Sequence, residues 1–335
     1  MYRILDLFSG AGGFSLGLDS LKGFKTVLAT DFNDSALQTL KHNFPHCKTI
    51  NGDITDSNIK QEIIDSAKEL NVNMIIGGPP CQGFSNKGKK LGLKDPRNFL
   101  FLEYLKIVEA ISPELFIIEN VPSLLTAADG YFIKEIKERI NDLGYIVNYD
   151  VLNSFDFGVP QVRKRAIIIA HKTKSISLPL PQNIRVTVKD AISDLSYLNS
   201  GEGENETSYK YKPKSSYQKQ LRNPSEKLFN HVATKHNSVA LEKLELIPPE
   251  GGKESLPIEL RGKQKFKTTW GRLKWDLPSP TIDTRFDTPS NGTNSHPYLN
   301  RAITPREAAR IQSFPDWFEF KGKKTAICTQ IGNAV

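Results

Sequence analysis

The sequence predicts an α/β protein with a parallel sheet covered on both faces, together with a second, looser domain. The first half alternates short apolar runs with segments whose apolar residues recur at helical spacing, as in strands joined by covering helices. Near residue 185 the chain becomes rich in Lys, Ser and Pro and loses its periodicity, which returns at residue 281. We therefore expect a first domain at residues 1–184, a second at 185–280, and a return to the first at 281–335.

Apolar runs that end in polar residues or glycine define the expected strands, and cap signals help to define the helices. Asn33 is suited to cap the helix that follows the second strand. Thr304 stands before Pro305 at a first helical position and three residues before Glu307, which is the pattern of a capping box. The expected strands are residues 3–8, 25–31, 72–78, 113–120, 144–153 and 163–171, and the expected helices are 15–21, 33–44, 98–111 and 304–314.

The overall composition is that of an ordinary globular protein and argues against several other classes. The chain has 335 residues, of which 38% are hydrophobic, enough for a large core. No apolar run approaches the ~18 residues of a membrane span, and the N-terminus does not read as a secretion signal. Three widely spaced cysteines, Cys47, Cys81 and Cys328, argue against a disulfide framework and a zinc site and fit a reducing cytosol.

Two runs carry many positive charges in a chain whose formal net charge is +8. Residues 209–222 hold five basic residues among three tyrosines, residues 261–275 hold six, and neither run contains an acid. Because a solvated face usually mixes both signs, we favour contacts with a polyanion over an ordinary solvated surface. The basic residues are Lys210, Lys212, Lys214, Lys219 and Arg222 in one run and Arg261, Lys263, Lys265, Lys267, Arg272 and Lys274 in the other.

A glycine-rich turn, Phe8–Gly13, joins the first strand to the first helix. Glycines at such a point let backbone amides approach a ligand at the carboxyl edge of the sheet. Asp31 ends the second strand, where it can accept from ribose hydroxyls; Phe32 offers a face to a purine, and Asp53 is placed to reach an adenine amino group. The turn lacks the G-x-G-x-x-G spacing, which favours a nucleoside cofactor over a pyrophosphate one. The alternative is a tight strand-to-helix turn with no ligand.

The run "IIGGPPC" places a cysteine directly after a buried strand. We expect Gly77 and Gly78 to let the backbone turn sharply, while the two prolines that follow fix φ and remove two amide donors. Cys81 is then held on a rigid base beside the cofactor edge. The Gly- and Lys-rich residues 85–97 are expected to form a mobile loop over a polyanion. The alternative for Cys81 is a buried structural thiol.

Large polar side chains follow two later apolar runs. Glu119 and Asn120 stand where a strand ends, so the Glu119 carboxyl is either a cap group or a general acid. Gln161, Arg163 and Arg165 recur at period two, which places them on one face of a strand. We favour an anion or base site there over a solvated face.

Six motifs together resemble, in order and spacing, the DNA (cytosine-5)-methyltransferases, over about residues 3–184 and 281–335. The compact length resembles bacterial restriction–modification or solitary enzymes. The family often has Glu and Trp where this chain has Asp31 and Phe32, an exchange that keeps the chemical roles. The motifs are Phe8–Gly13, Pro79–Gln82, Glu119–Val121, Gln161-x-Arg163-x-Arg165, Thr304–Pro315 and Gly332–Asn333.

The resemblance implies a Rossmann-like S-adenosylmethionine-dependent methyltransferase sheet with a smaller target-recognition domain at residues 185–280. It implies methylation of carbon 5 of a cytosine in a specific double-stranded DNA sequence, through a covalent Cys81 adduct on a flipped-out base, without a metal. The implied catalytic residues are Cys81, Glu119, Arg163 and Arg165. The implied cofactor-binding residues are Phe8, Gly10, Gly12, Gly13, Asp31, Phe32, Asp53, Ile54, Pro79, Leu100 and Asn333. The implied DNA-binding residues are Ser85, Lys87, Arg97, Gln161, Arg261 and Arg272.

Three alternatives remain open at this point: a tRNA cytosine-5 methyltransferase, a non-catalytic DNA-binding relative and a nicotinamide oxidoreductase. The interval of about a hundred residues before Thr304 favours DNA over tRNA, and the glycine spacing argues against nicotinamide. We expect a monomer in a bacterial cytoplasm, associated with the nucleoid. In the resembling family the Gly332–Asn333 turn opens a further helix, so we also expect a C-terminal segment or companion polypeptide beyond Val335.

Overall fold

The structure, a computed structural model, describes residues 1–80, 99–262 and 268–335. Its contacts divide the chain into two units. The first consists of Met1–Asn153, Lys164–Leu180 and Val335, and the second of Ser154–Arg163 and Pro181–Ala334.

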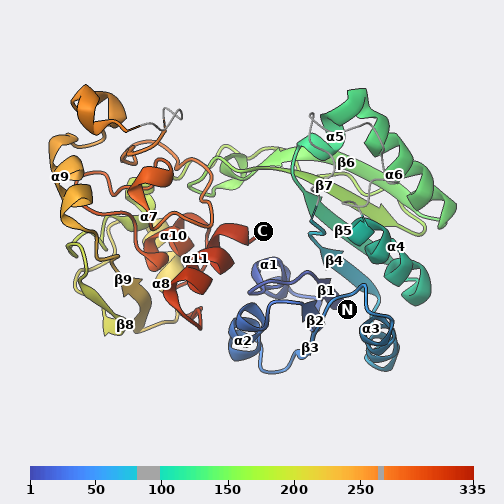
Figure 1. Cartoon of the computed structure of the whole chain (residues 1–335). Helices are drawn as coiled ribbons and strands as arrows, with labels where there is room; N and C mark the ends of the chain where they lie inside the picture. Colours follow the sequence, from blue (N-terminus) through green and yellow to red (C-terminus); the bar gives the residue numbers. More distant parts are fainter. Residues whose placement is uncertain (81–98, 263–267) are drawn as a thin grey trace. The chain divides into compact units, whose positions relative to one another are not determined.

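The first unit is built on a seven-stranded sheet with the strand order β3-β2-β1-β4-β5-β7-β6 (Figure 1). The strands are β1 (Tyr2–Leu7), β2 (Phe24–Asp31), β3 (Lys48–Asn51), β4 (Met74–Gly77), β5 (Leu115–Asn120), β6 (Ile146–Asn153) and β7 (Lys164–His171). The helices are α1 (Gly13–Asp19), α2 (Asp34–Asn43), α3 (Ser57–Glu69), α4 (Phe99–Ile111), α5 (Ser123–Thr126), η3 (Ala127–Gly130) and α6 (Tyr131–Asp142).

The sheet is parallel from β1 to β5, as expected, and departs from the expectation at one edge. β7 runs antiparallel to both β5 and β6. A parallel neighbour needs a long crossover, usually a helix, whereas only residues 154–163 lie between β6 and β7, and these hold just one short turn, η4 (Ser154–Phe157). The sequence analysis also missed β3, α3 and α6.

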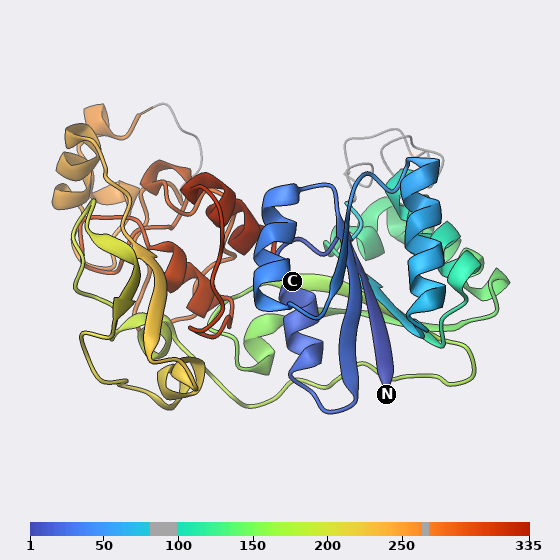
Figure 2. The same ribbon diagram turned by 90° about the horizontal axis from the view of Figure 1, so that it is seen from below.

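Helices cover both faces of this sheet (Figure 2). One face packs against α3, α4 and α6 through a large cluster that includes Leu5, Ile75 and Phe116. The next residues along the same strands, Ile4 and Ile76, point to the other face and pack with Phe14 and Leu18 of α1. Side chains in a strand alternate between faces, so a strand buried on both sides reads as a continuous apolar run.

The second unit holds short elements joined by long loops. Its strands are β8 (Gly203–Ser208) and β9 (Lys227–Val232), which pair antiparallel. Its longer helices are α7 (Val188–Ile192), α8 (Ser216–Arg222), α9 (Ser238–Leu246), α10 (Pro305–Ile311) and α11 (Lys324–Asn333). Its short turns are η4 (Ser154–Phe157), η5 (Lys253–Ser255), η6 (Ile258–Leu260) and η7 (Pro289–Asn291).

Helix α10 is the buried centre of the second unit. The predicted capping box is confirmed, because the Thr304 side chain accepts from the Glu307 backbone while Glu307 accepts from the Thr304 backbone. The Glu307 carboxylate also takes two hydrogen bonds from the buried Arg301 guanidinium, at 2.7 and 2.8 Å. Despite burial, the ionic partner Arg301 holds the pKa of Glu307 below its usual value.

A second buried ion cluster ties α10 to its neighbours. Arg310 donates to both oxygens of Asp316, at 2.8 and 2.6 Å, and to Asp194 just after α7, at 2.6 Å. Arg306 donates to three backbone carbonyls, of Phe229, Pro315 and Phe318. A single buried charge without these partners would be strongly unfavourable.

These contacts explain a difference from the expected domain boundaries. Residues 281–334 belong to the same unit as residues 185–280, rather than returning to the first unit. The reason is that α10 packs mainly against β9 and α7, and α11 against α10. The first boundary, at Leu180–Pro181, lies close to the expected one at residue 184.

His296 lies buried in the second unit as a neutral ring. Its Nδ1 accepts from the backbone amides of Tyr298 and Leu299, so the proton is on Nε2, which lies 3.0 Å from Ser196 Oγ. Burial lowers the pKa of His296 from 6.5 to about 3. The ring stands edge-on to Trp275, with centroids 5.3 Å apart.

We predict that the second unit loses stability as the pH falls below about 6.5. The folded state keeps His296 neutral while the unfolded chain binds a proton, so this contribution is complete above pH 6.5 and declines continuously towards pH 3. The expected cost is about 1.4 kcal/mol per pH unit. The three tryptophans, Trp270, Trp275 and Trp317, all lie in this unit, so their fluorescence during urea unfolding at pH 7.5 and 5.5 measures it selectively.

The variant His296→Gln provides the control for this prediction. It should be less stable at pH 7.5 because the ring's hydrogen bonds are lost, but its stability should fall less steeply towards pH 5.5. Equal pH slopes for the variant and the wild type would contradict the assignment.

Candidate active site

Three segments leave the sheet of the first unit from paired residues. Leu7, the last residue of β1, pairs with Gly77, the last residue of β4. Gly77 in turn pairs with Ile118 of β5, next to Glu119. The glycine turn, the segment leading to residue 80 and the Glu119 carboxyl therefore start side by side at the carboxyl edge.

Glycine at position 77 is required by a close approach between backbones. A Cβ atom there would lie 2.3 Å from the carbonyl oxygen of Leu7, and one on Gly78 would lie 3.1 Å from Oε2 of Glu119. Within the described residues 1–80, neither glycine is among those with a positive φ. The contacts show a further role for these glycines, which is to allow neighbouring segments to pack closely.

The backbone of the turn Phe8–Gly13 enters the left-handed region, which is unusual at the non-glycine residue Phe8. Phe8, Gly10 and Gly12 have φ values of 60°, 53° and 90°. The Ser9 amide donates to the Thr30 carbonyl of β2 at 3.0 Å. The turn is thus fixed to the neighbouring strand.

Asp31 and Phe32, both predicted cofactor residues, lie beside this turn. One Asp31 oxygen accepts from the Gly10 amide and the other from the Asn33 amide, both at 2.8 Å. Burial raises the pKa of Asp31, and these two hydrogen bonds oppose the rise. The Phe32 ring is 73% exposed, which leaves its faces open to a flat ligand.

The remaining predicted cofactor residues of the first unit occupy different environments. Asp53 is exposed and accepts from the Thr55 amide at 2.9 Å, whereas Ile54 is buried in the core. Pro79 is buried, and Leu100 is partly buried against the same core.

Glu119 of β5 forms an ion pair with Arg165 of β7. Arg165 Nε lies 2.6 Å from Glu119 Oε1, and Glu119 is 8% exposed. The pair joins adjacent antiparallel strands, β5 and β7. It holds the carboxyl of Glu119 in one orientation.

Asn120 has a role that the sequence did not reveal. Its side-chain nitrogen donates to the Pro79 carbonyl at 2.9 Å, and its oxygen accepts from the Val121 amide at 2.9 Å. The end of β5 therefore fixes the segment that follows β4.

Gln161 and Arg163 do not share a strand face with Arg165, which corrects the period-two interpretation. Strand β7 begins at Lys164. Gln161 and Arg163 precede the strand and belong to the second unit. Gln161 is buried, accepts from the Ile282 amide at 2.7 Å and donates to Gln312, so a direct DNA contact is not supported. Arg163 donates to the carbonyls of Ile282, Gly332 and Ala334, at 3.3, 3.3 and 2.8 Å.

Two arginines predicted to read DNA bases are used inside the second unit. Arg272 is 3% exposed, and its guanidinium donates to the carbonyls of Leu244, Ile247, His296 and Leu299 and to the Asn300 side chain. Its burial lowers its pKa to about 10. Arg261 donates to the backbone at Glu254 and Leu256, both at 2.8 Å. Arg272 is therefore a structural residue, and base reading by Arg261 has no support from these contacts.

Several predicted residues fall outside the described part of the chain or in the second unit. Cys81, Ser85, Lys87 and Arg97, together with Lys263, Lys265 and Lys267, lie outside the described residues. Asn333 is the last residue of α11 in the second unit. In this unit the Gly332–Asn333 pair ends a helix.

One pair in the first unit was missed entirely by the sequence analysis. The hydroxyl of Ser15 in α1 donates to Asp6 of β1 at 2.6 Å, and both residues are buried. The available signal was the single acidic residue inside the apolar run "RILDLF".

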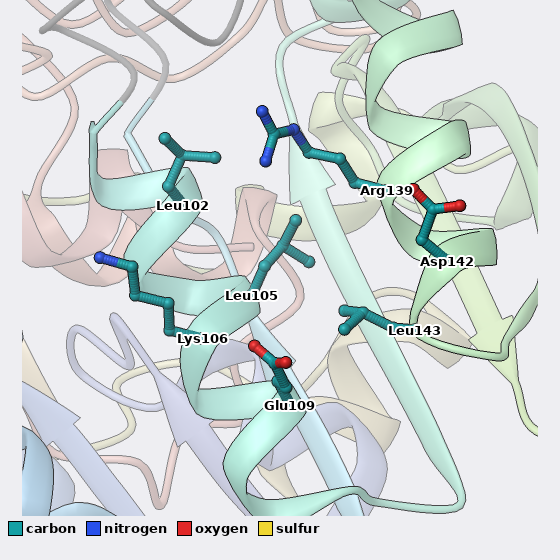
Figure 3. Close-up of a pocket in the computed structure, with 7 residues that line it drawn as sticks. All are labelled: Leu102, Leu105, Lys106, Glu109, Arg139, Asp142 and Leu143. Atoms are coloured by element: carbon teal, nitrogen blue, oxygen red, sulfur yellow. The ribbon is translucent and has the colours of Figure 1, made fainter.

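A groove of about 340 Å³ lies on the first unit between α4 and α6 (Figure 3). It contains none of the predicted site residues. It is lined by Leu102, Leu105, Lys106, Glu109, Arg139, Asp142 and Leu143.

No helix in the described ranges is long and apolar enough to cross a membrane. Within the same ranges there is no group of three or more His, Cys, Asp or Glu side chains placed to hold a metal ion.

Comparison with known proteins places the chain in one family. The family model described as C-5 cytosine-specific DNA methylase matches residues 2–335. The Type II methyltransferase M1.HphI of Haemophilus parahaemolyticus is 37% identical over 338 residues, covering 99% of this chain and 82% of that protein. The Type II methyltransferase M.DdeI of Desulfomicrobium norvegicum is 34% identical over 370 residues, covering 99% and 85%.

The solved structures agree with this placement. A DNA modification methyltransferase described as encoded within a prophage (E. coli) matches with a TM-score of 0.79 and 27% identity, covering 100% of this chain and 95% of that one. The Entamoeba histolytica methyltransferase EhMeth, 18% identical with a TM-score of 0.65, shows the shared fold. The chain belongs to the C-5 cytosine-specific DNA methylases and is a DNA (cytosine-5)-methyltransferase dependent on S-adenosylmethionine.

We predict that Gly77→Ala strongly destabilises the first unit, whereas Gly17→Ala does not. The new Cβ at position 77 would meet the Leu7 carbonyl, so β1 and β4 must separate at a cost of roughly 2 kcal/mol or more. At Gly17 in α1, no atom lies within 4 Å of the new Cβ, and alanine favours a helix by roughly 0.5–1 kcal/mol. Amide hydrogen exchange of β1 and β4 measures both effects, and unchanged protection in Gly77→Ala would contradict the close-packing account.

Proposed function

We propose that the enzyme methylates carbon 5 of a cytosine, flipped out of a specific double-stranded DNA sequence, through a covalent adduct with Cys81. The observation that carries this proposal is the position of Glu119. Its carboxyl is held by Arg165 and lies beside Gly78, three residues before Cys81. A thiol and an oriented carboxyl starting from neighbouring strands suit attack on a ring carbon combined with stabilisation of ring charge.

The cofactor is proposed to bind at the carboxyl edge, along the turn Phe8–Gly13. The exposed face of Phe32 fits a purine, and the partly buried carboxylate of Asp31 fits ribose hydroxyls. Asp53, Ile54, Pro79 and Leu100 complete the proposed contacts of this unit, and Asn333 is proposed for the amino-acid end. When bound, S-adenosylmethionine supplies the methyl group carried by its sulfonium.

The protein's own residues carry the remaining chemistry. Cytosine carbon 5 is a poor nucleophile, and bonding of the Cys81 thiolate to carbon 6 moves electron density onto it. Glu119 hydrogen-bonds ring nitrogen 3 and the exocyclic amine, stabilising the developing charge. Arg165 contacts the carbonyl at carbon 2. After methylation, loss of the carbon 5 proton breaks the bond to carbon 6 and releases Cys81.

Arg163 is proposed to order the site rather than to touch the base. Its guanidinium holds three backbone carbonyls of the second unit, including those of Gly332 and Ala334. This network keeps the neighbourhood of Asn333 fixed.

The second unit is proposed to recognise the target sequence, while Ser85, Lys87 and Arg97 are proposed to contact DNA beside the flipped base. The relatives above 30% identity are named Type II methyltransferases, which places the proposed DNA target in a restriction–modification setting. The same names do not favour the tRNA alternative.

We predict that Cys81→Ala abolishes methylation while binding S-adenosylhomocysteine nearly as the wild type does. DNA with 5-fluorocytosine at the target should trap the wild type covalently, because fluorine at carbon 5 cannot leave as a proton. Denaturing electrophoresis with radiolabelled DNA measures the complex. Cys328→Ala, which removes a buried thiol in the second unit, is the matched control and should still be trapped.

Absence of a denaturant-resistant complex with the wild type would contradict the covalent mechanism. So would a Cys81→Ala variant that still forms the complex.

We predict a salt dependence of binding to non-target DNA with a slope of roughly −4 to −5 in log K against log salt. Within the described parts of the two basic runs, five lysines are exposed, and each phosphate contact contributes about −0.9 to the slope. Lys212→Ala should make the slope shallower by about one. Lys137→Ala, on α6 of the first unit, is the control and should leave the slope unchanged. A slope near zero would show that the two runs are ordinary solvated surface. The five lysines are Lys210, Lys212, Lys214, Lys219 and Lys274.

A further inference from the structure

Asp6 and Ser15 form a hydrogen bond that spans the whole glycine turn. Asp6 belongs to β1, Ser15 to α1, and the turn Phe8–Gly13 lies between them in sequence. The Ser15 hydroxyl donates to Asp6 Oδ2 at 2.6 Å, with Asp6 1% exposed and Ser15 0% exposed. The bond therefore fixes the distance between the two ends of the turn from inside the unit.

Two backbone contacts hold the first half of the turn. The Ser9 amide reaches the Thr30 carbonyl, and the Gly10 amide reaches the Asp31 carboxylate. Helix α1 begins after Gly12, which lies in the left-handed region and provides no side-chain cap. The second half of the turn is held by the Gly12 amide, which donates to the Ser9 carbonyl at 2.9 Å, by the close packing of Gly12 near Phe44, and by the bond from Ser15 to Asp6.

We propose that Asp6 is a positioning residue for cofactor binding, acting through Ser15 to hold the glycine turn in its binding conformation. Asp6 is proposed to act through Ser15 rather than by contacting the cofactor itself. Its effect is mechanical and depends on the strength of one buried hydrogen bond. This inference rests on the proposed placement of the cofactor along the turn.

The charges that face Asp6 come from several elements. Asp31 of β2 and Asp19 at the end of α1 act on it electrostatically. Cys47, between α2 and β3, and Tyr104 of α4 are titratable groups that feel its charge. Burial raises the pKa of Asp6 to about 7, a rise that Asp31 and Asp19 reinforce and the hydrogen bond from Ser15 opposes.

The strength of the bond should therefore change near neutral pH. An ionised carboxylate accepts a charge-assisted hydrogen bond from Ser15, which is stronger than a bond between neutral partners. Deprotonation of Asp6 as the pH rises through about 7 tightens the turn, so cofactor affinity should be higher at pH 8 than at pH 6.

The test is the affinity for S-adenosylhomocysteine, measured by calorimetry from pH 6 to 8.5 on the full chain. In Ser15→Ala we expect affinity at pH 8 to fall by about three- to tenfold, the range of one hydrogen bond. The midpoint of any remaining pH dependence should move upward, because Ser15 no longer lowers the pKa of Asp6. In Asp6→Asn the amide oxygen still accepts from Ser15, so binding should persist while the pH dependence near 7 disappears.

Ser66→Ala, at another buried serine in α3 of the same unit, is the matched control and should bind like the wild type. An Asp6→Asn variant that keeps the wild-type pH profile would overturn the proposal, as would wild-type affinity in Ser15→Ala. A fall equal in Ser15→Ala and Ser66→Ala would also overturn it, because general destabilisation would then suffice. If Phe32→Ala left cofactor binding unchanged, the failure would lie in the proposed cofactor placement instead.

Discussion

The close approach of β4 to β1 at Gly77 is the constraint on which the active site depends. The Gly77 backbone lies so near the Leu7 carbonyl that no side chain fits between them. Both residues end their strands in register, and Ile118 of β5 pairs on the other side. The turn that is proposed to hold the cofactor, the segment that leads to the cysteine and the carboxyl proposed to bind the base therefore diverge from three adjacent points. A bulge or shift at this pairing would separate all three together.

Hydrogen bonds and one ion pair then fix the direction that each segment takes. Asp31 holds the first half of the glycine turn, Asn120 holds Pro79, and Arg165 holds Glu119. Each of these interactions joins two different segments of the chain. In the second unit the same role is played by buried ion pairs. The Arg310 cluster and the Arg301–Glu307 pair fix the central helix α10. In both units, buried polar groups with complete partners specify the arrangement.

The sequence predicted those features that depend on local chemistry. Apolar runs located six strands of the sheet, and the capping box at Thr304 located the start of α10. The turn Phe8–Gly13 was found because glycine spacing reflects backbone geometry. Arg272 shows where this reasoning fails: its basic neighbours suggested DNA, but its acceptors lie 24 to 28 residues away in sequence, and burial is decided by those distant groups. Gln161 was misplaced for the same reason, and the expected period-two face was wrong because β7 begins only at Lys164. The bond between Ser15 and Asp6 also needs the folded turn to bring its partners together.

A crystal structure of the full chain with S-adenosylhomocysteine tests the central claim most directly. That claim is that the paired ends of β1, β4 and β5, together with the end of β2, form a single site. The account predicts the purine against the Phe32 ring, the ribose hydroxyls at Asp31 and the remainder along the turn Phe8–Gly13, towards Pro79. Electron density for the cofactor at any other edge of the sheet, or away from Phe32, would contradict it.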